Sequence, residues 1–208
     1  MLQVQNNDKS STNCLIAVGS NLPSPLGSVR ETVTVALELL TANESIKVTA
    51  QSRLFQTPAY PPGAGPDFVN GAISVATELS AGAMLDLLHD IEFQMGRTRN
   101  NRWEARVLDL DLLNYGDQIL PDLPGFDHWA SMPAEQQLSS TPTELILPHP
   151  RLHNRGFVLV PLADIAPNWR HPRFERTVRQ MLADLSPDDL AGIKPLVVPA
   201  VPPDVRGK

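Results

Sequence analysis

Apolar residues follow two different spacings along the first half of the chain. The apolar run at residues 14–18 stops at Gly19, which is typical of a short buried strand. Apolar residues then recur three or four positions apart in two segments, and this period predicts two amphipathic helices. The first segment contains Leu26, Val29, Val33, Leu37 and Leu40, and the second contains Met84, Leu87, Leu88, Ile91 and Met95, with Gly96 as its expected end.

Strand-like stretches lie between and after these helices. Residues 46–55 read as one strand, and residues 68–77 alternate so that Phe68 and Asn70 fall on the same face. A further apolar stretch at residues 107–113 completes the set. Helices interleaved with strands in this way predict an α+β sandwich, with a mostly antiparallel sheet and helices packed on its faces.

The remaining segments have weaker patterns and define the expected limits of the domain. Residues 117–144 contain Pro, Ser and Asp without a clear period, so we expect an inserted loop there. Residues 177–185 are expected to form a last helix. Residues 1–13 are predicted to be a disordered leader, and the Pro-rich residues 186–208 a loosely attached tail. One domain over residues 14–185 remains.

Composition and charge limit the class of protein. The chain of 208 residues (22.8 kDa) has a formal net charge of −6, which argues against broad nucleic-acid binding because that requires a basic face. The single cysteine, Cys14, excludes an intramolecular disulfide and is expected to be a buried core thiol in a reducing compartment. No signal-peptide core or membrane-spanning run occurs in the sequence. We therefore expect a cytoplasmic protein that binds neither nucleic acid nor membrane.

The strongest chemical signal is a basic stretch that runs into an acidic strand. Residues 97–106 contain four arginines and a tryptophan, and they precede Asp109 and Asp111, which a strand projects to the same side. A divalent cation relieves the repulsion between paired carboxylates. Mg²⁺ commonly combines one or two carboxylates with substrate phosphates, which guanidinium groups also match. We interpret the stretch as a site for a metal-bound polyphosphate; the alternative is a solvated arginine face with surface ion pairs.

Two common phosphate-binding motifs are absent from the sequence. There is neither a G-x-x-x-x-G-K-[ST] loop nor a G-x-G-x-x-G fingerprint. If the protein binds a nucleotide, arginine side chains and metal would have to replace the glycine-rich cradle.

Six short blocks form an ordered set along the chain. They are IAVGSN (16–21), FQTP (55–58), DFVN (67–70), IEFQMGR (91–97), RVLDLD (106–111) and LPHPRLHNRGF (147–157). Each block alone is modest evidence, but in this order, and over residues 14–185, the chain resembles the 6-hydroxymethyl-7,8-dihydropterin pyrophosphokinase family. That family moves a pyrophosphoryl group from ATP to a pterin alcohol.

The resemblance implies a ferredoxin-like fold, ATP and a reduced pterin as substrates, and two Mg²⁺ ions held by Asp109 and Asp111. It also implies catalytic roles for Arg97 and Arg106 beside these aspartates. The residues implied for the pterin are Thr57, Phe68, Asn70 and Phe157, and those implied for ATP are Glu92, Arg99, Trp103, His149 and Arg155. Aromatic rings suit a flat heterocycle, and an amide offers its edge both a donor and an acceptor. We expect the active form to be a monomer or a weak homodimer.

The chain departs from the family pattern in the basic stretch. Glu104 stands where glycine is usual, and Ala105 where proline is frequent. A carboxylate that faces the phosphates opposes nucleotide binding, whereas one that points to solvent does not. Two alternatives therefore stay open: a divergent paralogue that binds pterin or nucleotide without efficient transfer, and a metal-dependent phosphohydrolase. The hydrolase uses the same aspartates but does not explain Phe68, Asn70 and Phe157.

Overall fold

In the computed structural model, residues 11–59, 65–96, 107–133, 136 and 140–197 are described. The elements among them, in chain order, are β1 (Thr12–Ser20), α1 (Val29–Ala42), β2 (Ile46–Gln51), β3 (Phe55–Thr57), β4 (Phe68–Thr77), α2 (Ala81–Gln94), β5 (Asp109–Tyr115), α3 (Leu123–Ser131), the 3₁₀ helix η1 (Leu152–Asn154), α5 (Gly156–Ile165), α6 (Val178–Asp184), α7 (Pro187–Leu190) and β6 (Lys194–Pro195). None of these helices has both the length and the apolar character needed to cross a bilayer.

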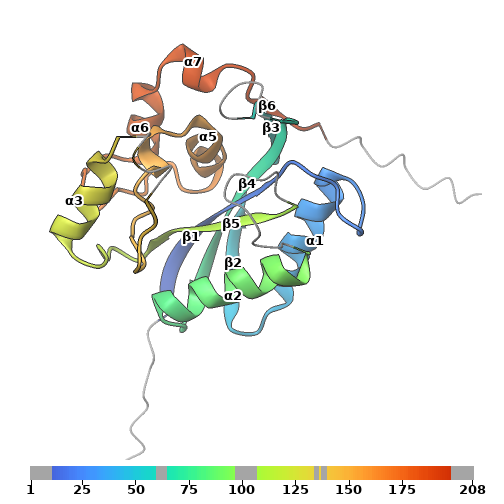
Figure 1. Cartoon of the computed structure of the whole chain (residues 1–208), viewed down its shortest axis with the longest axis horizontal. Coiled ribbons are helices and arrows are strands. Elements are labelled where there is room, and N and C mark those ends of the chain that lie inside the picture. The colour runs from blue at the N-terminus through green and yellow to red at the C-terminus, as the bar shows by residue number, and fades with distance from the viewer. Residues whose placement is uncertain (1–10, 60–64, 97–106, 134–135, 137–139, 198–208) are drawn as a thin grey trace, which may run out of the picture.

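The strands form a single sheet with helices on both faces (Figure 1). Its order is β5-β1-β4-β3-β6, and β2 also pairs with β4. The pairings between these strands are antiparallel. The α+β class with a mostly antiparallel sheet, predicted from the sequence, is confirmed. The stretch predicted as one strand over residues 46–55 is divided into β2 and β3, with residues 52–54 outside both strands.

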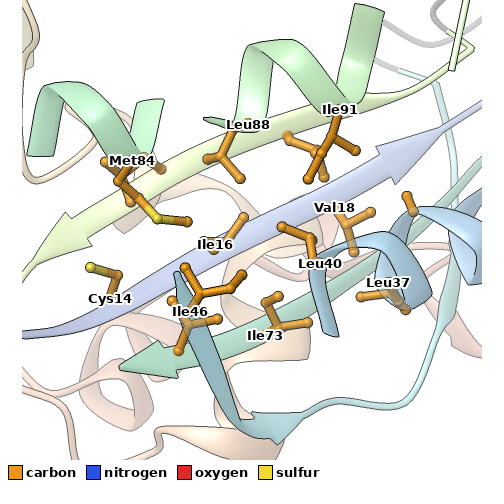
Figure 2. Packing of buried hydrophobic residues seen from close by; sticks show 14 of the residues in the cluster. Cys14, Ile16, Val18, Leu37, Leu40, Ile46, Ile73, Met84, Leu88 and Ile91 are labelled. Atoms are coloured by element: carbon orange, nitrogen blue, oxygen red, sulfur yellow. The ribbon is translucent and has the colours of Figure 1, made fainter. Parts of the chain in front are cut away.

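Helices α1 and α2 cover one face of the sheet. The apolar side chains predicted at helical spacing pack against that face. Burial of one such side chain contributes roughly 1.5–3 kcal/mol to folding. Cys14 lies in the same cluster, and burial raises the pKa of its thiol to about 12, so the predicted buried core thiol is confirmed. The side chains that pack between helices and sheet in Figure 2 include Leu37 and Leu40 of α1, Met84, Leu88 and Ile91 of α2, and Ile16 and Val18 of β1.

The start of α1 corrects one position of the predicted apolar stripe. Leu26 is 54% exposed and precedes the helix. The helix begins at Val29 because Ser28 and Glu31 form a capping box, in which each side chain accepts a hydrogen bond from the other residue's backbone N–H. Gly27, with φ 134°, turns the chain into this cap. The prediction that Leu26 belongs to the buried stripe is therefore wrong.

Helices α5 and α6 cover the opposite face. The second apolar cluster is smaller than the first and leaves part of this face to polar residues of β1, β4 and β5. Its buried members include Leu15, Ala72 and Leu113 of the sheet, Val158, Leu159 and Leu162 of α5, and Val178 and Met181 of α6.

Residues 117–144 contain the helix α3, which the sequence pattern does not predict. Asp122 caps its first turn by accepting a hydrogen bond from the Gly125 N–H. Phe126 is its only buried residue, so the helix has no apolar period to detect. Phe126 packs beside His171 and Phe174, and Arg173 forms an ion pair with Asp127.

Residues 187–196 correct the expectation of a loosely attached tail for that part of residues 186–208, whereas residues 198–208 lie outside the described residues. Residues 187–190 form α7, and Lys194–Pro195 form β6, which pairs with β3 at the edge of the sheet. The proline content suggested a tail, but Pro187 occupies the first turn of α7, where its missing N–H is not needed. Pro195 lies in an edge strand, the part of a sheet that tolerates proline.

Candidate active site

The paired aspartates lie on the edge strand of the sheet. In the β1–β5 ladder, Asp109 pairs with Gly19 and Asp111 with Ala17, and both carboxyl residues are partly exposed. Directly paired residues of an antiparallel ladder project to the same face, so the two aspartates point the same way, as their spacing predicts. Their partners on β1, a glycine and an alanine, have little or no side chain.

Two hydrogen bonds hold the beginning of this strand. Because β5 is an edge strand, the N–H of Leu110 faces away from β1 and toward α2, where a carboxylate oxygen of Glu92 accepts it at 2.8 Å. Glu92 is 1% exposed. On the other side, the Ser20 hydroxyl donates to the Val107 carbonyl oxygen at 2.6 Å. The backbone that carries both aspartates is thus fixed from α2 and from the end of β1.

The position of Glu92 bears on its predicted contact with ATP. A carboxylate that is 1% exposed and bonded to the Leu110 N–H favours a role in holding the aspartate strand over a direct contact with the nucleotide.

Sequence reasoning also gave Gly19 and Ser20 no role. The only signal for them was their place in the block at residues 16–21, which says nothing about the partner strand.

Two carboxylates on one face are a donor set that fits Mg²⁺. Within the described ranges, no group of three or more His, Cys, Asp or Glu side chains is placed to hold an ion. Mg²⁺ keeps several waters and is usually bound by one or two carboxylates together with substrate phosphates. Asp109 and Asp111, on one face beside small residues, match that requirement.

A second polar group lies on β3 and β4. The side-chain amide of Asn70 donates to the Thr57 hydroxyl at 2.7 Å, and both residues are buried, with exposed fractions of 8% and 1%. A Cβ atom on Gly19 would lie 2.5 Å from the Asn70 Oδ1, so glycine is needed for the amide to occupy this place. Phe68 pairs with Thr57 in the β3–β4 ladder, on the same face. The predicted alternation of Phe68 and Asn70 is confirmed.

Gly19 joins the two groups. It pairs with Asp109 on β5 and with Asn70 on β4, so these residues occupy one row across three strands. Neighbouring strands are about 4.8 Å apart, which puts the backbones of Asp109 and Asn70 about 10 Å apart. The structure therefore brings the predicted metal residues and predicted pterin residues together on one face.

The start of α5 supplies two further predicted residues, Arg155 just before the helix and Phe157 within it. Phe157 is partly buried against the α5–α6 cluster, and the Arg155 guanidinium lies over its ring, 5.6 Å from the centroid. The cation and the aromatic face stabilise each other. This contact fixes the guanidinium at the start of α5, where it can meet an anionic ligand.

His149 lies next to the aspartate strand. Its backbone N–H donates to the Leu113 carbonyl oxygen at 2.7 Å. Burial, and then the positive charge of Arg155, lower the pKa of His149 to about 3, while Asp109 acts in the opposite direction. The imidazole is therefore neutral at pH 7. Its Nδ1 accepts the Arg151 N–H at 3.1 Å, so the ring proton is placed on Nε2.

Four predicted residues lie outside the described residues. Arg97, Arg99, Trp103 and Arg106 belong to residues 97–106, as does Glu104, and their roles stay predictions.

Comparisons with known proteins identify relatives of the chain. Residues 15–167 match the sequence model of 7,8-dihydro-6-hydroxymethylpterin-pyrophosphokinase (HPPK). The chain is 37% identical over 157 residues to the 2-amino-4-hydroxy-6-hydroxymethyldihydropteridine pyrophosphokinase of Pseudomonas aeruginosa, covering 76% of this chain and 82% of the relative. It is 32% identical over 184 residues to the enzyme of that name from Methylorubrum extorquens, covering 88% of this chain and 99% of the relative.

Solved structures support the same fold. A crystal structure of the HPPK-DHPS of Plasmodium falciparum, a triple mutant, superposes with a TM-score of 0.59 at 14% identity. The superposition covers 86% of this chain but 45% of the other, so the chain spans less than half the length of that protein. The likeness confirms the ferredoxin-like α+β fold implied by the resemblance. With its match over residues 15–167, the chain belongs to the 7,8-dihydro-6-hydroxymethylpterin-pyrophosphokinase family.

Proposed function

We propose that this chain transfers a pyrophosphoryl group from ATP to the hydroxymethyl group of 6-hydroxymethyl-7,8-dihydropterin and releases AMP, a reaction of folate biosynthesis. The observation that carries the proposal is the pairing of Gly19 with both Asp109 and Asn70. Residues suited to a metal-bound polyphosphate and residues suited to a flat heterocycle thus share one face, roughly 10 Å apart. That separation suits two substrates that react end to end.

The acceptor binds at the β3–β4 end of the row. Phe68 and Phe157 enclose the pterin ring between their aromatic faces, which suits a flat heterocycle. The side-chain amide of Asn70 forms hydrogen bonds with the edge of the ring. Its hydrogen bond to Thr57 orients the amide before the pterin arrives, so less conformational freedom is lost on binding.

The donor binds at the β5 end of the row. Asp109 and Asp111 hold Mg²⁺, and two ions are part of this proposal. Mg²⁺ held there would supply positive charge that offsets the charge of the phosphates. The pterin hydroxyl oxygen attacks the β-phosphorus of ATP, and the bond from that phosphorus to the oxygen bridging it to the α-phosphorus breaks, so AMP leaves. This chemistry depends on alignment and charge neutralisation, without a covalent enzyme intermediate.

Side chains beyond the sheet complete the ATP site in this proposal. His149, neutral with its proton on Nε2, donates a hydrogen bond to a phosphate oxygen, and Arg155 offsets phosphate charge. The basic residues at positions 97–106 contribute positive charge to the ATP site in this proposal. Arg97 and Arg106 act there on the transferred and leaving groups, and Arg99 and Trp103 contact the nucleotide.

The test is a product assay with a matched pair of aspartate variants. Purified protein is incubated with Mg-ATP and the dihydropterin, and AMP and pterin pyrophosphate are separated by chromatography. Asp111→Asn is expected to lower turnover on the order of 100-fold or more because it removes a charge that organises the reacting phosphates. Asp117→Asn, at an exposed position just beyond β5, is the control and should leave turnover unchanged.

Each other outcome contradicts a different part of the proposal. Near-normal turnover in Asp111→Asn would refute the metal assignment. Loss of ATP without pterin would indicate a phosphohydrolase, and binding of pterin without any product would indicate a non-catalytic paralogue.

A further inference from the structure

After α6 the chain returns to the sheet beside the residues assigned to the pterin. Strand β6 pairs with β3, with Gln56 opposite Lys194 and Phe55 opposite Pro195. The Leu196 N–H extends this contact by donating to the Leu54 carbonyl oxygen at 2.8 Å. Residues 187–196, which we call the C-terminal brace, are therefore hydrogen-bonded to the strand that carries Thr57.

The same segment packs against the beginning of α5. Gly156 has no room for a side chain because a Cβ atom there would clash with the Asp189 carbonyl oxygen of α7. A Cβ atom at Gly156 would also lie 3.0 Å from the Cδ1 of Ile193. The brace thus contacts the residue that directly precedes Phe157.

A third contact joins the C-terminal brace to the residue that follows β3. Gly192 has φ +76°, a left-handed conformation that favours glycine, and a Cβ atom there would lie 2.6 Å from the Cγ of Pro58. Pro58 directly follows Thr57. The brace therefore touches the neighbour of each of two pterin residues, which belong to segments about 100 residues apart in the chain.

We propose that the C-terminal brace holds Thr57 and Phe157 at a fixed separation and thereby determines the affinity for the pterin. The inference rests on the proposed placement of the pterin between these segments. Residues 187–196 lie outside residues 15–167, the range that matches the family model. Asp109 and Asp111 are held by β1 and α2 instead, so the brace should affect pterin binding more than use of Mg-ATP.

The test compares glycine substitutions that share backbone strain but differ in position. Gly192→Ala places a methyl group against Pro58, whereas Gly116→Ala, with φ +54°, adds the same kind of strain beyond the opposite end of β5 from Asp109. Ile193→Ala, a second brace variant, removes the contact with Gly156 without backbone strain. The Kd of the pterin is measured by fluorescence titration, KM for both substrates by the AMP assay, and Tm by thermal unfolding.

The expected result separates the two substrates. Gly192→Ala should raise the Kd of the pterin roughly tenfold, which corresponds to a loss of about 1.4 kcal/mol of binding free energy. Ile193→Ala should raise the Kd of the pterin by a smaller factor. In both brace variants, KM for Mg-ATP should stay within about twofold of the parent value. Gly116→Ala should change neither the Kd of the pterin nor KM for Mg-ATP. Equal weakening of both substrates in the brace variants, or the same effect in Gly116→Ala, would overturn the inference.

One further variant distinguishes failure of the brace from failure of the pterin site. If Phe157→Ala leaves the Kd of the pterin unchanged, the proposed placement of the pterin is wrong and the inference falls with it. If Phe157→Ala loses affinity while Gly192→Ala and Ile193→Ala retain it, only the brace is refuted.

Discussion

The buried carboxylate of Glu92 offers the sharpest test of how the aspartate strand is held. Glu92→Ala removes the acceptor of the Leu110 N–H, which lies between the two aspartates. Glu92→Gln removes the charge but keeps a side-chain oxygen that can accept the same hydrogen bond. The pair therefore separates positioning of the strand from the charge of the carboxylate.

The expected size of the effect of Glu92→Ala follows from the burial of Glu92 and from its hydrogen bond with the Leu110 N–H. A hydrogen bond to a charged group contributes about 1.5–3 kcal/mol, and Glu92→Ala also leaves a buried N–H unsatisfied. For a chain of this size, a loss of about 2 kcal/mol lowers Tm by roughly 4–8 °C. Loss of a group that orients a metal ligand reduces metal affinity or activity about 10- to 100-fold. Glu92→Ala should therefore need more Mg²⁺ for half-maximal activity, and Glu92→Gln should stay closer to the parent protein.

The assay is a Mg²⁺ titration of AMP formation, with Tm and KM for ATP measured on the same samples. Glu38→Ala, an exposed glutamate of α1, is the control and should change stability by less than about 0.5 kcal/mol. An unchanged Mg²⁺ requirement and Tm in Glu92→Ala would refute the positioning role. A raised KM for ATP in Glu92→Gln, with Tm and Mg²⁺ requirement unchanged, would instead support direct contact with the nucleotide.

Two further predictions concern the pterin site and the response to acid. Gly19→Ala places a methyl group 2.5 Å from the Asn70 Oδ1, so the amide should leave Thr57 and the Kd of the pterin should rise about tenfold; an unchanged Kd in a titration would contradict this. Burial lowers the pKa of His171 from 6.5 to about 3, so the unfolded state binds a proton that the folded state does not. The part of the free energy of unfolding that depends on neutral His171 should be fully present above about pH 6.5. It should fall by about 2 kcal/mol between pH 7 and pH 5. Denaturant unfolding of His171→Asn should show a smaller fall, and an identical fall in the variant would refute the assignment.

Local patterns predicted the parts of the fold whose side chains repeat. The period of Met84, Leu88 and Ile91 predicted α2 because an amphipathic helix on a sheet buries every third or fourth residue. Alternation on β4 likewise placed Phe68 and Asn70 on one face. The helix α3 has only Phe126 buried, so no pattern marked it.

The ends of helices and strands depend on caps and strand pairing, which the spacing of apolar residues does not reveal. Leu26 fits the spacing of α1, but the cap made by Ser28 and Glu31 starts the helix after it. The proline-rich C-terminal segment resembles a tail in composition, and its pairing as β6 depends on an open edge at β3 that lies far away in sequence.

For the site, the sequence by itself determined the chemistry of single segments. Asp109 and Asp111 point the same way because a strand alternates, and the six ordered blocks identified the family. Only the tertiary structure decided that Gly19 lies between Asp109 and Asn70, that Glu92 is buried against the Leu110 N–H, and that the brace joins β3 to α5. The physical reason is that strand order, register and side-chain burial arise from contacts between distant segments, which no local spacing encodes.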